Sequence, residues 1–255
     1  SALLTALSTQ GYQFGLFSSD GFSQPLYRQA LLSDYTLPAS EEQPNASTVS
    51  QWQNWLGAQK SDGTPWFSWV ALHGPTVSGD NAKARQRSYM RQAPALNEQI
   101  QAILTTLQQR DLLKNTVVVI TAQHGVPLDG DPDNEGNRQI LQVPLVIHWP
   151  DTPAQTVTRL SDHQDMMVTL MQRLLHVSTN PVNYAQGEDL FAAQRRHDWV
   201  TSSEDNKLVI TTRDITLVLN NNGSYRAYDA SGKVLKDHKP ELALLLQVLT
   251  EEKRF

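Results

Sequence analysis

Polar side chains that could do chemistry follow an apolar run near the middle of the chain. Residues 116–121 include four consecutive β-branched side chains and predict a fully buried strand, which the chain leaves at Gln123, His124 and Gly125. Open α/β sheets hold ligands just past the carboxyl ends of their strands. His124 could bind a metal through a neutral imidazole nitrogen, whereas Gln123 offers a carbonyl oxygen without negative charge. The pair predicts at most a weakened metal site, and for His124 we favour a residue satisfied within its pocket over a metal ligand.

An acidic loop follows this turn, with Asp129, Asp131, Asp133 and Glu135 at alternate positions. The spacing is superficially that of a calcium loop, but the glycine and the distal glutamate of an EF-hand are out of register. We therefore favour a solvated acidic loop over a calcium site.

Two groups of cationic residues could meet lipid phosphates or an acidic partner. Lys83, Arg87 and Arg91 are spaced by four residues and would share one face of a helix, while Arg195 and Arg196 form a second cluster. A cation near an anionic membrane surface contributes about 1 kcal/mol. A solvated helix face is the alternative for both groups.

The elements that must position these residues alternate along most of the chain. Apolar spacing predicts helices at 1–10, 49–59, 80–113 and 163–176, and strands at 12–18, 66–72, 116–121 and 142–148. Pro94 marks a kink or a new start in the third helix. This alternation indicates an α/β fold, a mostly parallel sheet with helices on both faces.

The pattern changes near residue 196. Short strands separated by Asn-Gly and Ser-Gly turns predict a small antiparallel sheet, and Pro240 begins a terminal helix that closes it. We therefore predict an α/β core at 1–196 and a β subdomain at 197–255.

Bulk properties narrow the function classes. The net charge of −5 argues against a general nucleic-acid binder, and the absence of cysteine excludes disulfides and cysteine-ligated metal sites. No apolar run approaches the roughly 20 residues that span a bilayer. The chain starts at Ser1 rather than Met, so we expect a piece of a longer protein.

Six segments, in order, resemble the sulfatase and alkaline-phosphatase superfamily. They are residues 11–18, 65–73, 116–125, 143–150, 163–170 and 187–190. The resemblance implies a metal-activated Thr, Ser or modified Cys nucleophile in a part of the protein preceding this chain. It also implies that Gln123 stands where the family has Asp, and that His73 faces a phosphate or sulfate. A turn residue is the alternative for His73. Gln123, His124 and His73 are thus the predicted vestigial site.

At finer grain, residues 172–179 and 245–255 resemble the periplasmic domain of a Gram-negative inner-membrane member of this superfamily. That resemblance implies membrane helices ahead of this chain, binding of lipid A or cardiolipin, and control of lipopolysaccharide synthesis through the protease adaptor LapB. We predict a non-catalytic lipid-responsive domain with no cofactor, apart from a weak divalent metal in the full-length protein. One alternative is a metal-dependent phosphatase or phosphoethanolamine-type transferase with an upstream nucleophile. The other is a scaffold that docks a membrane partner through its basic faces.

Overall fold

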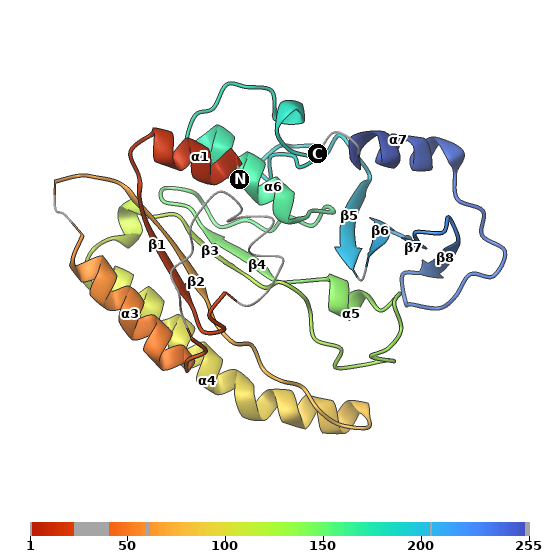
Figure 1. Cartoon of the computed structure of the whole chain (residues 1–255), viewed down its shortest axis with the longest axis horizontal. Helices are drawn as coiled ribbons and strands as arrows, with labels where there is room; N and C mark the ends of the chain where they lie inside the picture. Colours follow the sequence, from red (N-terminus) through yellow and green to blue (C-terminus); the bar gives the residue numbers. More distant parts are fainter. Residues whose placement is uncertain (1, 23–40, 60–61, 205, 253–255) are drawn as a thin grey trace. The chain divides into compact units, whose positions relative to one another are not determined.

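The computed structural model describes residues 2–22, 41–59, 62–204 and 206–252 (Figure 1). Its backbone packs as two compact units that alternate along the sequence. The first unit comprises Ser1–Thr121 and Leu145–Thr152, and the second comprises Ala122–Pro144 and Pro153–Phe255. The predicted domain boundary near residue 196 stays a prediction.

The described residues of the first unit form two small sheets and include the longest of the described helices. Its elements are α1 (Ala2–Thr9), β1 (Gln13–Ser18), α3 (Asn45–Gly57), β2 (Trp66–Ala71), α4 (Ala82–Gln109), a 3₁₀ turn (Leu113–Asn115), β3 (Val118–Thr121) and β4 (Leu145–His148). Strands β1 and β2 are parallel, with Gln13 opposite Trp66. Strands β3 and β4 are antiparallel, with Val118 opposite His148.

Helices α3 and α4 form the main core of this unit, side by side along the strands in Figure 1. Trp52 and Leu56 of α3, four residues apart, are buried together with Leu107 of α4. Trp52 also donates its indole N–H to Ser68 Oγ at 3.0 Å. Gly15 in β1 allows the ring of Trp55 to lie close, since a Cβ there would be 2.6 Å from it.

Two local predictions for this unit change. Pro94 lies inside a continuous α4, so a new helix start is wrong there and a kink stays a prediction. The strand predicted at 116–121 is β3, whose residues are half-buried or, at Thr121, exposed. A strand is fully buried when both faces are covered. Within the described residues β3 pairs with β4 alone.

The second unit consists of short helices and a four-stranded sheet. Its elements are α5 (Arg138–Leu141), α6 (His163–Thr169), a π-helical turn (Leu170–Leu174), a 3₁₀ turn (Pro181–Asn183), β5 (Trp199–Glu204), β6 (Lys207–Thr212), β7 (Ile215–Leu219), β8 (Tyr225–Asp229) and α7 (Leu242–Glu252). The strands are antiparallel in the order β5-β6-β7-β8. The helix predicted at 163–176 therefore leaves α-geometry after Thr169.

Helix α7 covers one face of this sheet. Its Val248 is fully buried with Trp199, Ile210 and Leu217. Leucines 242, 246 and 249, on the opposite side of α7, are exposed. The predicted α/β class, with a C-terminal antiparallel sheet closed by a helix, is confirmed.

Candidate functional site

The turn that carries Gln123 and His124 belongs to the second unit, and both side chains are exposed. Nδ1 of His124 lies 3.1 Å from the carbonyl oxygen of Gly125. Gly125 fixes the turn against α5: its N–H donates to Ile140 O at 2.7 Å, and a Cβ would lie 1.6 Å from Gln139 O. Across the described residues, no three His, Asp or Glu side chains gather where they could share a metal ion.

His73 belongs to the first unit, where it follows β2. The side chain of Asn45 binds it on both sides, accepting from His73 N at 2.8 Å and donating to His73 O at 2.9 Å. Nε2 of His73 lies 3.5 Å from a carboxylate oxygen of Glu42. His73 is therefore held at its backbone, while its ring remains partly exposed.

A polar cluster at the same strand ends was not predicted from the sequence. Ser19 follows β1 and is buried, with its Oγ 2.7 Å from Asn45 Oδ1 and 2.8 Å from Thr48 Oγ1. The carboxyl ends of parallel strands meet at one edge, so β1 and β2 bring Ser19 and His73 onto the same asparagine. The signal was Ser19-Asp20, polar residues directly after a predicted strand.

We predicted a solvated acidic loop. Its three aspartates are exposed, in agreement with that prediction. Glu135 differs, because Lys207 Nζ lies 3.0 Å from its carboxylate and the hydroxyl of Tyr228 donates to it at 2.5 Å. Burial would raise the pKa of Glu135, but these two hydrogen bonds bring it below its ordinary value. Burial and the neighbouring carboxylate raise the pKa of Tyr228 to about 12.

This loop is also fastened to the sheet at its end. The guanidinium of Arg138 donates to Thr212 O at 2.7 Å and to Arg213 O at 2.9 Å, and Asn134 Nδ2 donates to Gly232 O at 2.7 Å. Residues 134–138 are thus part of the second unit's folded body.

The three cations of α4 that are spaced by four residues are exposed, as their spacing predicts. Lys83, Arg87 and Arg91 face solvent, with Met90 beside them at 67% exposure. Arg85 is buried on the other side of the helix. A lipid or partner contact by the exposed stripe stays a prediction.

Arg195 was predicted to contact a lipid or partner, and its location corrects that prediction. Its side chain is 8% exposed and forms an ion pair with Asp165, which is 1% exposed. Its Nε lies 3.4 Å from Glu188 Oε2. Asp165 lies 30 residues before Arg195 and Glu188 lies in the loop just before it, and the Arg-Arg-His run by itself indicates neither partner. Arg196 is exposed, and its surface role stays a prediction.

Asp165 also closes the first turn of α6. Asp162 Oδ1 accepts from Asp165 N at 3.1 Å, and Asp165 Oδ2 accepts from Asp162 N at 3.0 Å, a reciprocal capping box. Burial and the charge of Asp165 raise the pKa of Asp162 to about 7, against the opposing effect of Arg195.

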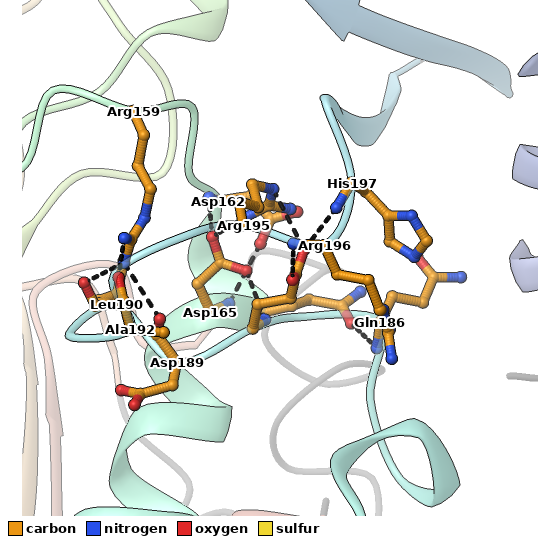
Figure 2. Close-up of polar contacts among 12 residues, drawn as sticks. Arg159, Asp162, Asp165, Gln186, Asp189, Leu190, Ala192, Arg195, Arg196 and His197 are labelled. Atoms are coloured by element: carbon orange, nitrogen blue, oxygen red, sulfur yellow. Dashed lines mark hydrogen bonds and ion pairs between the residues drawn. The ribbon is translucent and has the colours of Figure 1, made fainter.

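The loop at 186–197 completes this network, which we call the Arg195 network (Asp162, Asp165, Glu188 and Arg195). Glu188 N donates to Asp165 Oδ1 at 2.7 Å, and Leu190 N donates to Thr169 Oγ1 at 2.9 Å. Arg159 donates to three carbonyls of the same loop (Figure 2). Two of the sequence segments that carry the superfamily resemblance, 163–170 and 187–190, therefore meet in a buried ion-pair network.

Comparison with known proteins identifies the relatives of this architecture. The sulfatase family model matches residues 1–177. The inner membrane protein YejM of Salmonella typhimurium is 53% identical over all 255 residues, which cover 44% of that protein. An uncharacterized protein of Haemophilus influenzae is 29% identical over 254 residues, covering 97% of this chain and 41% of that protein. The chain thus spans less than half the length of these relatives.

Solved structures show the same fold at low sequence identity. A Vibrio parahaemolyticus protein of the alkaline phosphatase superfamily matches 97% of this chain and 66% of its own, with a TM-score of 0.67 and 17% identity. The lipoteichoic acid synthase LtaP of Listeria monocytogenes matches 99% of this chain and 70% of its own, with a TM-score of 0.67 and 10% identity. Among the described helices, none combines the length and apolar character needed to cross a bilayer.

Proposed function

Because this chain belongs to the sulfatase family, we propose that it is a periplasmic regulatory domain of an inner-membrane protein, which responds to anionic lipid and catalyses no hydrolysis of its own. The observation that carries the proposal is the 53% identity, over the whole chain, to the inner membrane protein YejM. The lipid is lipid A or cardiolipin, and its occupancy controls engagement of the protease adaptor LapB and hence lipopolysaccharide synthesis.

The Gln123–His124 turn supports a role other than hydrolysis. A hard divalent cation binds best to charged oxygen ligands, and Gln123 contributes a neutral one. The charged side chain of Glu135 in the adjacent loop is already paired with Lys207. These features favour a domain that has kept the fold of metal-dependent hydrolases without their chemistry.

The exposed stripe on α4 supports contact with lipid phosphates. Lys83, Arg87 and Arg91 present three positive charges with an exposed methionine among them. Three cations near an anionic surface contribute about 3 kcal/mol in total, which is roughly a hundredfold in affinity.

Charge removal in the full-length protein tests this contact. We expect the K83Q/R87Q/R91Q protein, purified in neutral detergent, to retain roughly a hundredfold less lipid A or cardiolipin by native mass spectrometry. The matched control is K233Q/K236Q/K239Q, which removes the same charge from other exposed lysines. Equal lipid loss in both proteins would remove the α4 stripe from the proposal, and co-purification of LapB would be scored in parallel.

Metal and turnover assays test the non-catalytic assignment. The full-length protein should hydrolyse no p-nitrophenyl phosphate in the presence of Mn²⁺ or Mg²⁺, and Q123D should bind Mn²⁺ more tightly than the wild type. Metal-dependent turnover by the wild type would instead favour a phosphatase or phosphoethanolamine-type transferase.

A further inference from the structure

Near its middle, helix α7 is joined to the rest of the second unit by hydrogen bonds of Gln247 to Trp199 and His197, which we call the Gln247 network. Oε1 of Gln247, on α7, lies 3.3 Å from Trp199 Nε1, and Nε2 of Gln247 lies 3.1 Å from His197 Nδ1. The His197 ring stacks on Trp199, with centroids 4.8 Å apart and planes 24° from parallel. His197 is 7% exposed.

The donors and acceptors of the Gln247 network determine which nitrogen of His197 carries a proton. An indole N–H can only donate, so the oxygen of the Gln247 amide must face Trp199. The amide NH₂ then faces His197, and because NH₂ can only donate, Nδ1 of His197 must be an unprotonated acceptor. The imidazole is therefore neutral, with its proton on Nε2. This buried Nε2 has no hydrogen-bond partner within the described part of the chain.

Protonation of His197 is incompatible with the hydrogen bonds of the Gln247 network. In the imidazolium both ring nitrogens carry a hydrogen, so Nδ1–H would point at the amide NH₂ of Gln247. Rotating the amide to offer its oxygen to His197 would point the NH₂ at the indole N–H of Trp199. Either arrangement places two donors face to face and removes one of the bonds that hold α7.

We propose that His197 is a pH switch for helix α7: the neutral imidazole holds the helix, and protonation loosens it from the sheet. The helix is suited to local opening because it buries one face, through Val248, while Leu242, Leu246 and Leu249 remain exposed. A further attachment, from Gln186 Nε2 to Glu251 O at 3.1 Å, lies near the end of the helix.

The charges around His197 act in both directions. Its own segment brings Arg195 and Arg196, the preceding loop brings Glu188, and α7 brings Glu251. Burial, followed by the positive charge of Arg196, lowers the pKa of His197, whereas Glu188 and Glu251 oppose this. Glu188 is already engaged by the backbone N–H groups of Arg196 and His197. A histidine with a lowered folded-state pKa costs no stability above its ordinary value of about 6.5, and destabilises as the pH falls below it.

Hydrogen exchange in the full-length protein tests the switch. Exchange of backbone amides in 242–252, corrected for the intrinsic pH dependence of exchange and referenced to β7, should accelerate between pH 7.5 and pH 5.5. Each unit by which folding lowers the His197 pKa changes the opening equilibrium by a factor of about ten. Unchanged protection of α7 across this range would overturn the proposal.

Three variants separate the switch from a merely structural role. H197Q keeps an acceptor for Gln247 without a titrating group, so the pH response of α7 should disappear. Q247E offers a carboxylate that accepts from both Trp199 and a protonated imidazole, so the response should reverse and α7 should be better protected at pH 5.5. The control H176N removes an exposed histidine at a positive φ that suits Asn, and should respond as the wild type does.

Each outcome decides the question. An H197Q response equal to that of the wild type, or a Q247E response of unchanged sign, contradicts the switch. If H197Q fails to fold, Q247E and the wild-type pH series still decide it, because neither removes the imidazole.

Discussion

Replacement of Arg195 by Met would leave Asp165 buried without its cation. Asp165 is 1% exposed and retains two backbone donors, from Asp162 N and Glu188 N, but these do not neutralise its charge. Removing one partner of a buried ion pair costs about 3–5 kcal/mol. For a unit of this size, at about 3 °C per kcal/mol, the expected fall in Tm is about 10–15 °C.

The pH dependence adds a signature specific to this network. Arg195 lowers the pKa of Asp162, so its removal drives that carboxyl further toward the protonated form. Proton uptake by Asp162 removes one of the two neighbouring negative charges that Arg195 would otherwise compensate. The loss of stability in R195M should therefore be larger at pH 8 than at pH 5.5.

The assay is thermal unfolding of the full-length protein followed by tryptophan fluorescence. Arg173→Met is the matched control, because Arg173 pairs with Asp189 in the same unit but its side chain is 46% exposed. Because the cation of this pair is largely exposed, although Asp189 is 16% exposed, the pair contributes about 1 kcal/mol, so R173M should lower Tm by about 3 °C. Equal losses in R195M and R173M, or an R195M loss independent of pH, would refute the reasoning from burial.

Three further predictions concern Asp162, Gly187 and Tyr228, all in the second unit. D162N should gain stability relative to the wild type as the pH rises from about 4 to about 7, by at least about 1 kcal/mol at pH 8 as measured by denaturant midpoints. The folded-state pKa of Asp162, about 7, lies above its ordinary value of 3.8, so ionisation in the folded protein is penalised across that range. G187A should cost about 1–3 kcal/mol, since its Cβ would lie 2.2 Å from Gln164, whereas G74A, with no atom within 4 Å, should stay within about 0.5 kcal/mol in the same measurement. Y228F should cost about 1–2 kcal/mol and raise the pKa of the Glu135 carboxyl, which a carbon-detected NMR titration would show.

Local apolar spacing was sufficient to predict most helices and strands. Leu3, Leu4 and Leu7 recur at helical intervals and are the buried residues of α1. The four strands of the C-terminal sheet follow from their turn residues and alternate side chains. Pairing direction was not predictable in the same way, because the antiparallel β3–β4 pair depends on contacts between segments more than 20 residues apart.

The polar sites were less accessible to prediction, since a side chain's type does not reveal its partner. Arg195 lies 30 residues from Asp165, and nothing in its immediate sequence distinguishes it from the exposed Arg196. Asn45 reaches His73 over 28 residues for the same reason. The exposure of Gln123 and His124 likewise depends on Gly125 meeting α5, a contact that spacing alone does not reveal.

The interleaving of the two units has a consequence for synthesis on the ribosome. The segment 122–144 emerges before the first unit is complete, yet its partners lie far downstream: Lys207 is 72 residues beyond Glu135, and Gly232 is 98 residues beyond Asn134. At about 5–20 residues per second, this segment waits roughly 5–20 s for the strands that will hold it. During that interval β4 can already pair with β3 and enclose the segment as a loop. Truncations that end before β6 should therefore leave this loop without its anchoring partners, so C-terminal shortening would disturb the turn of Gln123 and His124 from a distant part of the sequence.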